Sequence, residues 1–196
     1  MPTLIFLPLF LLSMSANAND KLWAQLKNEP YMVVMVRNAE SSGNVDGANM
    51  LAWDASGNCA GESILTEAGK IQAQLLGKAF STRGIKPVVI SSPMCRCKQT
   101  AQIAFGDHLV DANLRQRAVD DSASQEKFLQ TANTLLASQR GKSPVVFINH
   151  RPNIDALTME LIGLGELLVG RLSEDGEIET IGIIRIEQQN DMPERR

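Results

Sequence analysis

Three runs of apolar residues stand out along the chain. They cover 32–36 (MVVMV), 87–90 (PVVI) and 144–149 (PVVFIN) and are rich in Val and Ile. Continuous apolar runs of this length are typical of strands that are buried on both faces of a sheet. A later segment, 177–187 (EIETIGIIRIE), alternates in part between apolar and polar residues and predicts another strand.

Between these strands the apolar positions recur at helical spacing, as in the segment that Thr66 caps and Gly84 ends. Helices are predicted for 20–27, 66–84, 92–105, 125–138 and 153–162, and a short strand for 108–110. Because strands and helices alternate, we predict an α/β fold, a three-layer α/β/α sandwich around a mostly parallel sheet.

The N-terminus has a different pattern. The nine-residue run LIFLPLFLL at 4–12 is apolar, and Ala16-Asn17-Ala18 follows it with small-x-small spacing. This pattern predicts a signal peptide over 1–18, although no Lys or Arg precedes the run, and a buried first strand or helix is the alternative. A bilayer needs about 20 residues. We therefore expect an exported, periplasmic protein without a stable membrane anchor.

Composition adds limits. The chain has 196 residues, a hydrophobic fraction of 44% and a net charge of −3, without a basic run. These values favour one globular domain over 19–187 and a flexible tail over 188–196, and they argue against nucleic acid as a partner. The loop at 39–64 is rich in Gly, Asn, Ser and Asp, and loops of this length are usually functional.

Three cysteines are present, Cys59, Cys95 and Cys97. In an oxidising compartment Cys59 would pair with Cys95 or Cys97; the alternative is three small apolar core residues. Two cysteines one residue apart suit neither a zinc site nor a thioredoxin-type pair. We expect no metal and no cofactor.

Polar residues with anion-binding chemistry follow each of the three apolar strands. Arg37 ends the first, Arg96 lies shortly after the second, and His150 and Arg151 follow the third. Ligands of parallel sheets bind at the carboxyl ends of the strands, and the planar guanidinium group matches phosphate oxygens in pairs. These positions predict an anion pocket.

Four segments resemble motifs of the histidine phosphatase superfamily, also called phosphoglycerate mutase-like. They are VVMVRNAES at 33–41, LTEAGKIQAQLLGKAF at 65–80, SSPMCRCKQTA at 91–101 and VVFINHRPNIDALT at 145–158. The resemblance implies a phosphoglycerate mutase-like fold. It also implies that Arg37 and Arg96 bind phosphate and that His150 contacts the phosphoryl group.

The family nucleophile is the histidine that follows the first arginine, and Asn38 occupies that position here. An amide nitrogen has its lone pair delocalised into the carbonyl, so Asn38 keeps the pocket polar without supplying a nucleophile. The alternatives are Ser41 or Ser42 as nucleophile, and His150 acting directly or through a water.

The family also uses an acidic proton donor between its third and fourth motifs. Asp120 and Asp121 are the candidates here, with Asp111 less favoured. Glu40 is interpreted as a support for the arginines. Glu40, Ser41 and Arg151 are possible ligand contacts.

Three functions follow as hypotheses. The first is an exported protein that binds a phosphorylated small molecule or sugar without phosphohistidine chemistry, that is, a pseudoenzyme. The second is an active periplasmic phosphomonoesterase, because exported members with a similar first motif act on lipopolysaccharide core heptose phosphate. The third is a non-enzymatic interaction module.

Overall fold

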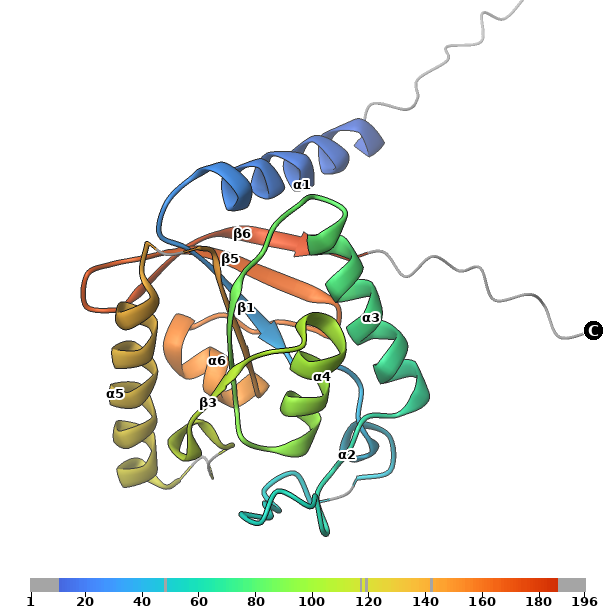
Figure 1. Cartoon of the computed structure of the whole chain (residues 1–196), viewed down its shortest axis with the longest axis vertical. Helices are drawn as coiled ribbons and strands as arrows, with labels where there is room; N and C mark the ends of the chain where they lie inside the picture. The colour runs from blue at the N-terminus through green and yellow to red at the C-terminus, as the bar shows by residue number, and fades with distance from the viewer. Residues whose placement is uncertain (1–10, 48, 117, 119, 142, 187–196) are drawn as a thin grey trace, which may run out of the picture.

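The structure is a computed structural model that describes residues 11–186 except 48, 117, 119 and 142, and only the backbone of 11–17. Figure 1 shows the arrangement of its elements. In chain order they are α1 (Leu11–Asn28), β1 (Met32–Arg37), α2 (Ser42–Val45), α3 (Glu67–Ser81), β2 (Val88–Ser91), α4 (Cys95–Phe105), β3 (Leu109–Val110), the 3₁₀ turn η1 (Ala112–Leu114), α5 (Ser122–Gln139), β4 (Val145–Asn149), α6 (Arg151–Thr158), β5 (Glu166–Leu172) and β6 (Ile178–Arg185).

The strands form one sheet of six in the order β3-β2-β4-β1-β5-β6. The pairs β3-β2, β2-β4 and β4-β1 are parallel, whereas β5 is antiparallel to both β1 and β6. The mixed α/β fold and the mostly parallel sheet confirm the predicted fold class. β1 lies near the middle of the sheet, so its C-terminal end is covered on both sides.

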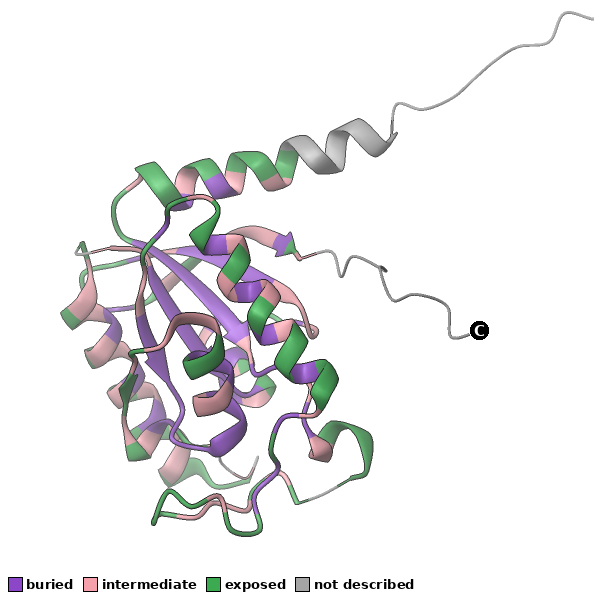
Figure 2. Cartoon of the chain, turned by 45° about the vertical axis from the view of Figure 1, so that its right-hand side comes forward, coloured by how far each residue is buried: buried purple, intermediate pink, exposed green. Residues whose placement is uncertain are grey.

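Alternate residues of the central strands face two separate hydrophobic clusters. Val34 and Val36 pack with Trp23 of α1 and Phe80 of α3 on one face of the sheet. Val33 and its neighbours pack on the other face, with α5 and α6. Figure 2 shows buried residues along the central strands and exposed residues on the outer sides of the surrounding helices. The predicted three layers follow from this alternation.

The helix α1 begins before the predicted cleavage point and continues through it. Among the side chains described in α1, those from Ala18 onward, Trp23 and Leu26 are buried. Cleavage after Ala18 would therefore leave the contacts of these two residues intact, and the signal peptide stays a prediction. Residues 1–10 and the predicted tail at 188–196 lie outside the described residues. None of the described helices combines the length and apolar character that crossing a membrane requires.

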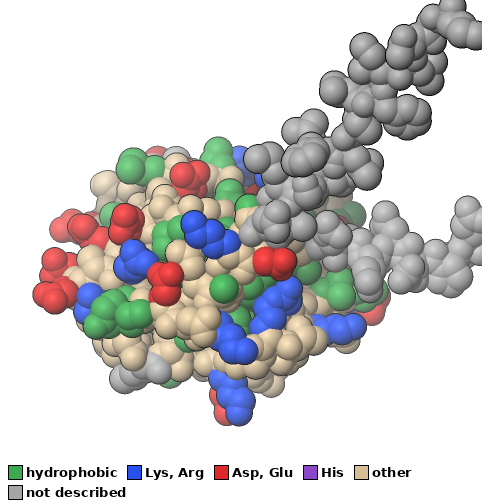
Figure 3. Space-filling view, turned by 90° about the horizontal axis from the view of Figure 1, so that it is seen from above, with side chains coloured by type: hydrophobic (Ala, Val, Ile, Leu, Met, Phe, Trp, Pro, Cys, Tyr) green, Lys and Arg blue, Asp and Glu red, His purple; other side chains and the backbone are tan. Residues whose placement is uncertain are grey.

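The end of the molecule that carries α1 has a mixed surface. Figure 3 looks onto this end and shows acidic and basic side chains interspersed, with acidic ones most frequent on the left and no histidine visible.

Two predicted elements differ from the observed ones. The prediction omitted β5 because its sequence, ELLVGRL, places Gly170 and Arg171 inside the strand. The helix predicted for 153–162 begins at Arg151 and ends at Thr158, where Met159 adopts a left-handed conformation with φ of 57°. The polar loop at 39–64 contains the short helix α2.

Candidate functional site

Neighbouring strands end side by side and position the candidate site. Arg37, the last residue of β1, lies opposite Asn149, the last residue of β4. The backbone N–H of Asn38 donates to the Asn149 carbonyl at 3.0 Å. Ser92 and His150 follow β2 and β4 at the same edge of the sheet. The residues predicted from the three strand ends are therefore brought together.

A pocket of about 450 Å³ opens at this edge. It is lined by the end of β1, the loop after it, the segment after η1, and α6 with the loop that follows. The polar side chains with which it can meet a ligand include Arg37, Asn38, Gln116, His150, Arg151 and Asp155.

Arg96 is fully buried at 0% exposure and is hydrogen-bonded to two residues of the pocket lining. Its Nη2 donates to the carbonyl of Met50 at 2.9 Å and to Oε1 of Gln116 at 2.8 Å. Its Nε and Nη1 are buried and have no hydrogen-bond partner among the described residues. Buried donors without acceptors are rare because each costs about 1–3 kcal/mol. Two donors of this guanidinium group therefore lack an acceptor among the described residues.

The charges of Arg151 and Arg96 act against that of Arg37. None forms an ion pair with a described acidic residue, since the described ion pairs all lie elsewhere. The pKa of Arg37 is lowered, first by burial and then by the charges of Arg151 and Arg96. Burial also lowers the pKa of Arg96. An anionic ligand would relieve this repulsion, because it would supply the negative charge that these groups lack.

Asn38 is buried at 2% exposure and lines the pocket beside Arg37. Its Nδ2 donates to the Ala39 carbonyl at 2.9 Å. The backbone of Ala39 is held in turn by the hydroxyl of Thr100, which accepts from Ala39 N at 3.1 Å and donates to the Arg96 carbonyl at 2.7 Å. The position expected for the nucleophile is therefore in place and rigidly held, with an amide as its side chain.

His150 is a buried, neutral imidazole. Its Nε2 lies 2.7 Å from the Ser92 hydroxyl, and the Cys97 thiol lies 3.6 Å from its Nδ1. Burial, followed by the charges of Arg96 and Arg37, lowers the pKa of His150 well below 6.5. Burial raises the pKa of the Cys97 thiol to about 12, so the thiolate that a cysteine nucleophile needs is not formed.

We expect the buried imidazole to make folding stability depend on pH. The folded protein keeps His150 neutral, whereas the unfolded chain binds a proton below pH 6.5, so stability falls as the pH drops below that value. One such group gives a slope of about 1.4 kcal/mol per pH unit. Urea unfolding between pH 5 and 7 should show that His150→Gln removes this part of the slope. The matched control is His108→Gln; equal slopes in both variants would contradict the expectation.

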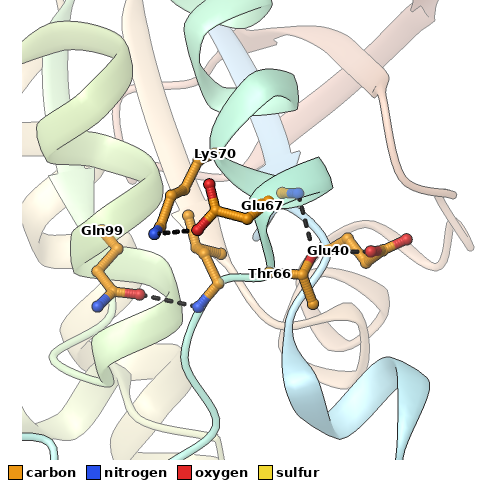
Figure 4. A network of polar contacts seen from close by, with 7 residues as sticks. Glu40, Thr66, Glu67, Lys70 and Gln99 are labelled. Atoms are coloured by element: carbon orange, nitrogen blue, oxygen red, sulfur yellow. Dashed lines mark hydrogen bonds and ion pairs between the residues drawn. The ribbon is translucent and has the colours of Figure 1, made fainter.

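The second motif shapes the loop that follows Arg37. Thr66 caps α3, and its hydroxyl also donates to the Glu40 carboxylate at 2.7 Å, as Figure 4 shows. Gln72 Oε1 accepts from Glu40 N at 2.9 Å. A Cβ atom on Gly69 would lie 1.9 Å from the Glu40 carbonyl oxygen, so only glycine permits this approach. Glu40 thus contacts Thr66, where we expected it to support the arginines, and it does not line the pocket.

The predicted serine nucleophiles are occupied by local hydrogen bonds. Ser41 is fully buried; its hydroxyl donates to Asn44 Oδ1 and accepts from the Ser63 hydroxyl, both at 3.0 Å. The Ser42 hydroxyl donates to Ser63 at 3.3 Å. Neither serine lines the pocket, whereas Asn44 does.

The candidate proton donors also lie outside the pocket lining. The Asp121 side chain caps α5 by accepting from Ser124 N at 3.0 Å, and Asp111 caps η1. Asp120 is exposed at the start of the same helix. Between the third and fourth motifs it is Gln116 that lines the pocket. We missed Gln116 because we searched that segment for carboxylates alone.

Gln116 is positioned by the fourth motif. Nδ2 of Asn153 in α6 donates to the carbonyl of Arg115 at 3.0 Å, to that of Leu114 at 3.3 Å and to Oδ1 of Asn149 at 3.0 Å. Asn153 therefore joins α6, β4 and the segment that carries Gln116. Asp155, two residues further along α6, is a carboxylate in the lining that we also did not predict.

A disulfide between Cys59 and Cys95 closes the loop over Arg96. This pairing is one of the two that we considered, and Cys97 remains a free, buried thiol. Beside the disulfide, the carboxylate of Glu62 accepts from Cys95 N at 2.7 Å and from Asp54 N at 2.8 Å. The loop is thus fixed at the start of α4. The described residues contain no His, Cys, Asp and Glu cluster that could hold a metal ion.

Comparison with known sequences gives a family match. Residues 33–121 match the histidine phosphatase superfamily (branch 1), a range that includes Arg37, Asn38 and Arg96. No curated protein matches the chain.

Solved structures share the fold at low sequence identity. The protein histidine phosphatase SixA complexed with tungstate has 16% identity and a TM-score of 0.51, over 79% of this chain and 96% of that one. The Rv3214 protein of Mycobacterium tuberculosis has 17% identity and a TM-score of 0.60, over 78% and 96%. A phosphoserine phosphatase of Entamoeba histolytica, in complex with 3-phosphoglyceric acid, has 15% identity and a TM-score of 0.59, over 80% and 98%. Residues 33–121 are thus similar to the histidine phosphatase superfamily (branch 1), and the chain as a whole shares the fold of these solved structures.

Proposed function

We propose that this protein binds a phosphomonoester in the pocket formed over Arg37, Arg96, His150 and Arg151. The observation that carries the proposal is Arg96, whose Nε and Nη1 are buried without an acceptor. Each of these two N–H groups can donate to a phosphate oxygen, and the neutral His150 adds a polar contact. Phosphate would also separate the charges of Arg37 and Arg151, which now repel each other.

The proposal includes the loss of phosphohistidine chemistry. Asn38 stands at the nucleophile position, and the Asn amide nitrogen has no lone pair to attack phosphorus. Gln116 lines the pocket where the family's proton donor is expected, and an amide cannot act as a carboxylic acid. Because both positions carry amides, the pocket keeps its polarity while it lacks both reacting groups.

The structural neighbours support the class of ligand. One phosphoserine phosphatase structure holds 3-phosphoglyceric acid, and a variant of that enzyme holds phosphoserine. Both ligands are phosphorylated small molecules, as the arginine pocket of this chain requires.

We also propose that the protein is exported. Its apolar run at 4–12 and the spacing of Ala16 and Ala18 support a signal peptide. The disulfide between Cys59 and Cys95 supports it independently, because disulfides persist mainly in oxidising compartments.

Restoring the missing groups should restore turnover. We expect Asn38→His to raise the rate of phosphate release from p-nitrophenyl phosphate on the order of 10³-fold over the unmodified chain, because a neutral imidazole supplies the nucleophile. Adding Gln116→Glu should contribute about 10²-fold more, the lower end of general acid catalysis. A phosphosugar panel extends the same assay to physiological leaving groups.

The control places a histidine at another amide of the same pocket. Asn44→His should stay inactive, because Asn44 does not follow the strand that ends in Arg37. High activity of the unmodified chain that disappears in His150→Ala would instead show a working phosphatase with another nucleophile. Binding of phosphate by none of these proteins in calorimetry would contradict the pocket itself.

A further inference from the structure

The imidazole of His150 is held by a serine that does not itself line the pocket. Ser92 follows β2 and His150 follows β4, and these two strands are parallel neighbours. The Ser92 hydroxyl lies 2.7 Å from Nε2 of His150, and both residues are buried, at 0% and 1% exposure. His150 is part of the pocket lining, whereas Ser92 is not. One ring nitrogen is therefore already occupied by a buried group of the protein.

The bond to Ser92 decides the role of the second ring nitrogen, because a neutral imidazole has one donor and one acceptor. The Ser92 hydroxyl has one proton to donate, and it already accepts from the backbone N–H of Met94 at 3.3 Å. If Ser92 donates to Nε2, the ring proton lies on Nδ1. If Nε2 donates instead, Nδ1 has a lone pair, and the serine proton would turn to the sulfur of Cys97, a weak acceptor beside the ring.

An anionic ligand discriminates between these two arrangements. The oxygens of a phosphomonoester dianion accept hydrogen bonds, so only a nitrogen that carries a proton can bind them. Because Nε2 is occupied by Ser92, Nδ1 is the nitrogen with which His150 can contact a phosphate. The Cys97 sulfur, 3.6 Å from Nδ1, is a weak competitor for that contact. A phosphate contact by this ring thus requires the proton on Nδ1.

We propose that Ser92 is a positioning residue for the phosphate site: its hydroxyl donates to Nε2 and so keeps the ring proton of His150 on Nδ1. The inference rests on the proposed function, since it assigns how the same pocket uses His150. The imidazole then offers an N–H group to the phosphate while it stays uncharged. Ser92 has this effect from the end of β2, outside the pocket lining.

Long-range ¹H–¹⁵N correlation NMR of the labelled chain reads the tautomer directly, because the sequence contains two histidines, His108 and His150. At neutral pH we expect a protonated Nδ1 and an unprotonated Nε2 for His150, both in the free chain and with inorganic phosphate. His108 is an internal reference, since its Nδ1 lies 2.8 Å from the Gly106 carbonyl, which can only accept. A protonated Nε2 of His150 in either state would overturn the inference.

Variants then test whether Ser92 is the cause. In Ser92→Ala we expect the ring proton to be shared between both nitrogens. Phosphate affinity, measured by calorimetry, should fall roughly 2- to 12-fold, the contribution of one hydrogen bond. Ser92→Thr keeps the hydroxyl and should restore both readouts. The matched control is Ser91→Ala, which removes a neighbouring buried hydroxyl that donates to the Ser92 carbonyl at 2.9 Å rather than to the ring. It should change neither readout.

The remaining outcomes separate this inference from the proposed function. An unchanged tautomer in Ser92→Ala would overturn the inference, even if affinity fell, because it would leave Ser92 with a packing role alone. A tautomer that changes in Cys97→Ala but not in Ser92→Ala would assign the role to the thiol and also overturn it. Failure of the unmodified chain to bind inorganic phosphate would overturn the proposed function itself, whichever nitrogen is protonated.

Discussion

Replacement of Arg96 by methionine is expected to abolish measurable phosphate binding. Removing one partner of a buried charged contact costs about 2–5 kcal/mol, which weakens binding roughly 30- to 5,000-fold. The loss should be this large because Arg96 is fully buried and two of its donors have no other acceptor. Methionine has a similar length, so the core keeps most of its packing. Calorimetric titration with inorganic phosphate measures the effect.

Two further variants serve as comparisons for the phosphate affinity of Arg96→Met. Arg96→Lys keeps the charge but lacks the planar fork, so its affinity should fall between those of the unmodified chain and Arg96→Met. Arg83 stacks on the ring of Trp23, where its guanidinium carbon lies 4.4 Å from the ring centroid and outside the pocket. Arg83→Met should leave phosphate affinity unchanged. Normal phosphate binding by Arg96→Met would remove Arg96 from the site.

Loss of the disulfide should have the largest effect on stability. The bond joins residues separated by 36 positions, and closing a loop of that length in the unfolded chain is worth about 3–4 kcal/mol. Cys59→Ser should lower the free energy of unfolding by about this amount. It should also weaken phosphate binding, because the loop carries the Met50 carbonyl that holds Arg96. Urea unfolding and calorimetry measure the two effects.

The control variant is Cys97→Ala, which removes a buried thiol without opening a cross-link. A reducing agent should destabilise the unmodified chain and Cys97→Ala but not Cys59→Ser. Mass spectrometry of the protein recovered from whole cells reports the disulfide and the N-terminus together. A reduced protein that still begins at Met1 would contradict the proposed export.

Local sequence patterns were sufficient to predict most of the parallel strands of the sheet. The runs that became β1, β2 and β4 are apolar because both of their faces are covered, and that pattern is independent of the rest of the fold. The segment of β5 is apolar as well, but Gly170 and Arg171 lie within it. Gly170 is needed because a Cβ there would meet Ile178 and Glu179 of β6 at 2.7 and 2.8 Å. That contact depends on strand pairing, which a single segment does not reveal.

Site residues could be predicted from the sequence where the residue type has one characteristic chemical role. Arginines at strand ends indicated an anion pocket, and Arg37, His150 and Arg151 do line one pocket. Residues with several roles were harder to assign. Asp121 became a helix cap, and Ser41 a buried hydrogen-bonding residue. Gln116 was missed because an amide has no distinctive spacing, and its place in the pocket depends on Asn153, distant in the sequence.

Asn153 shows that a residue of a family motif can have a structural role that does not depend on the reaction. Its side chain meets no reacting group but joins three segments of the chain. Selection for a folded protein alone would therefore preserve it after turnover has been lost. The same holds for Thr66, Gly69 and Gln72, which shape a loop. A genome survey that assigns proteins to the family by such structural positions would consequently group inactive and active members together. The residue after the first arginine would distinguish them.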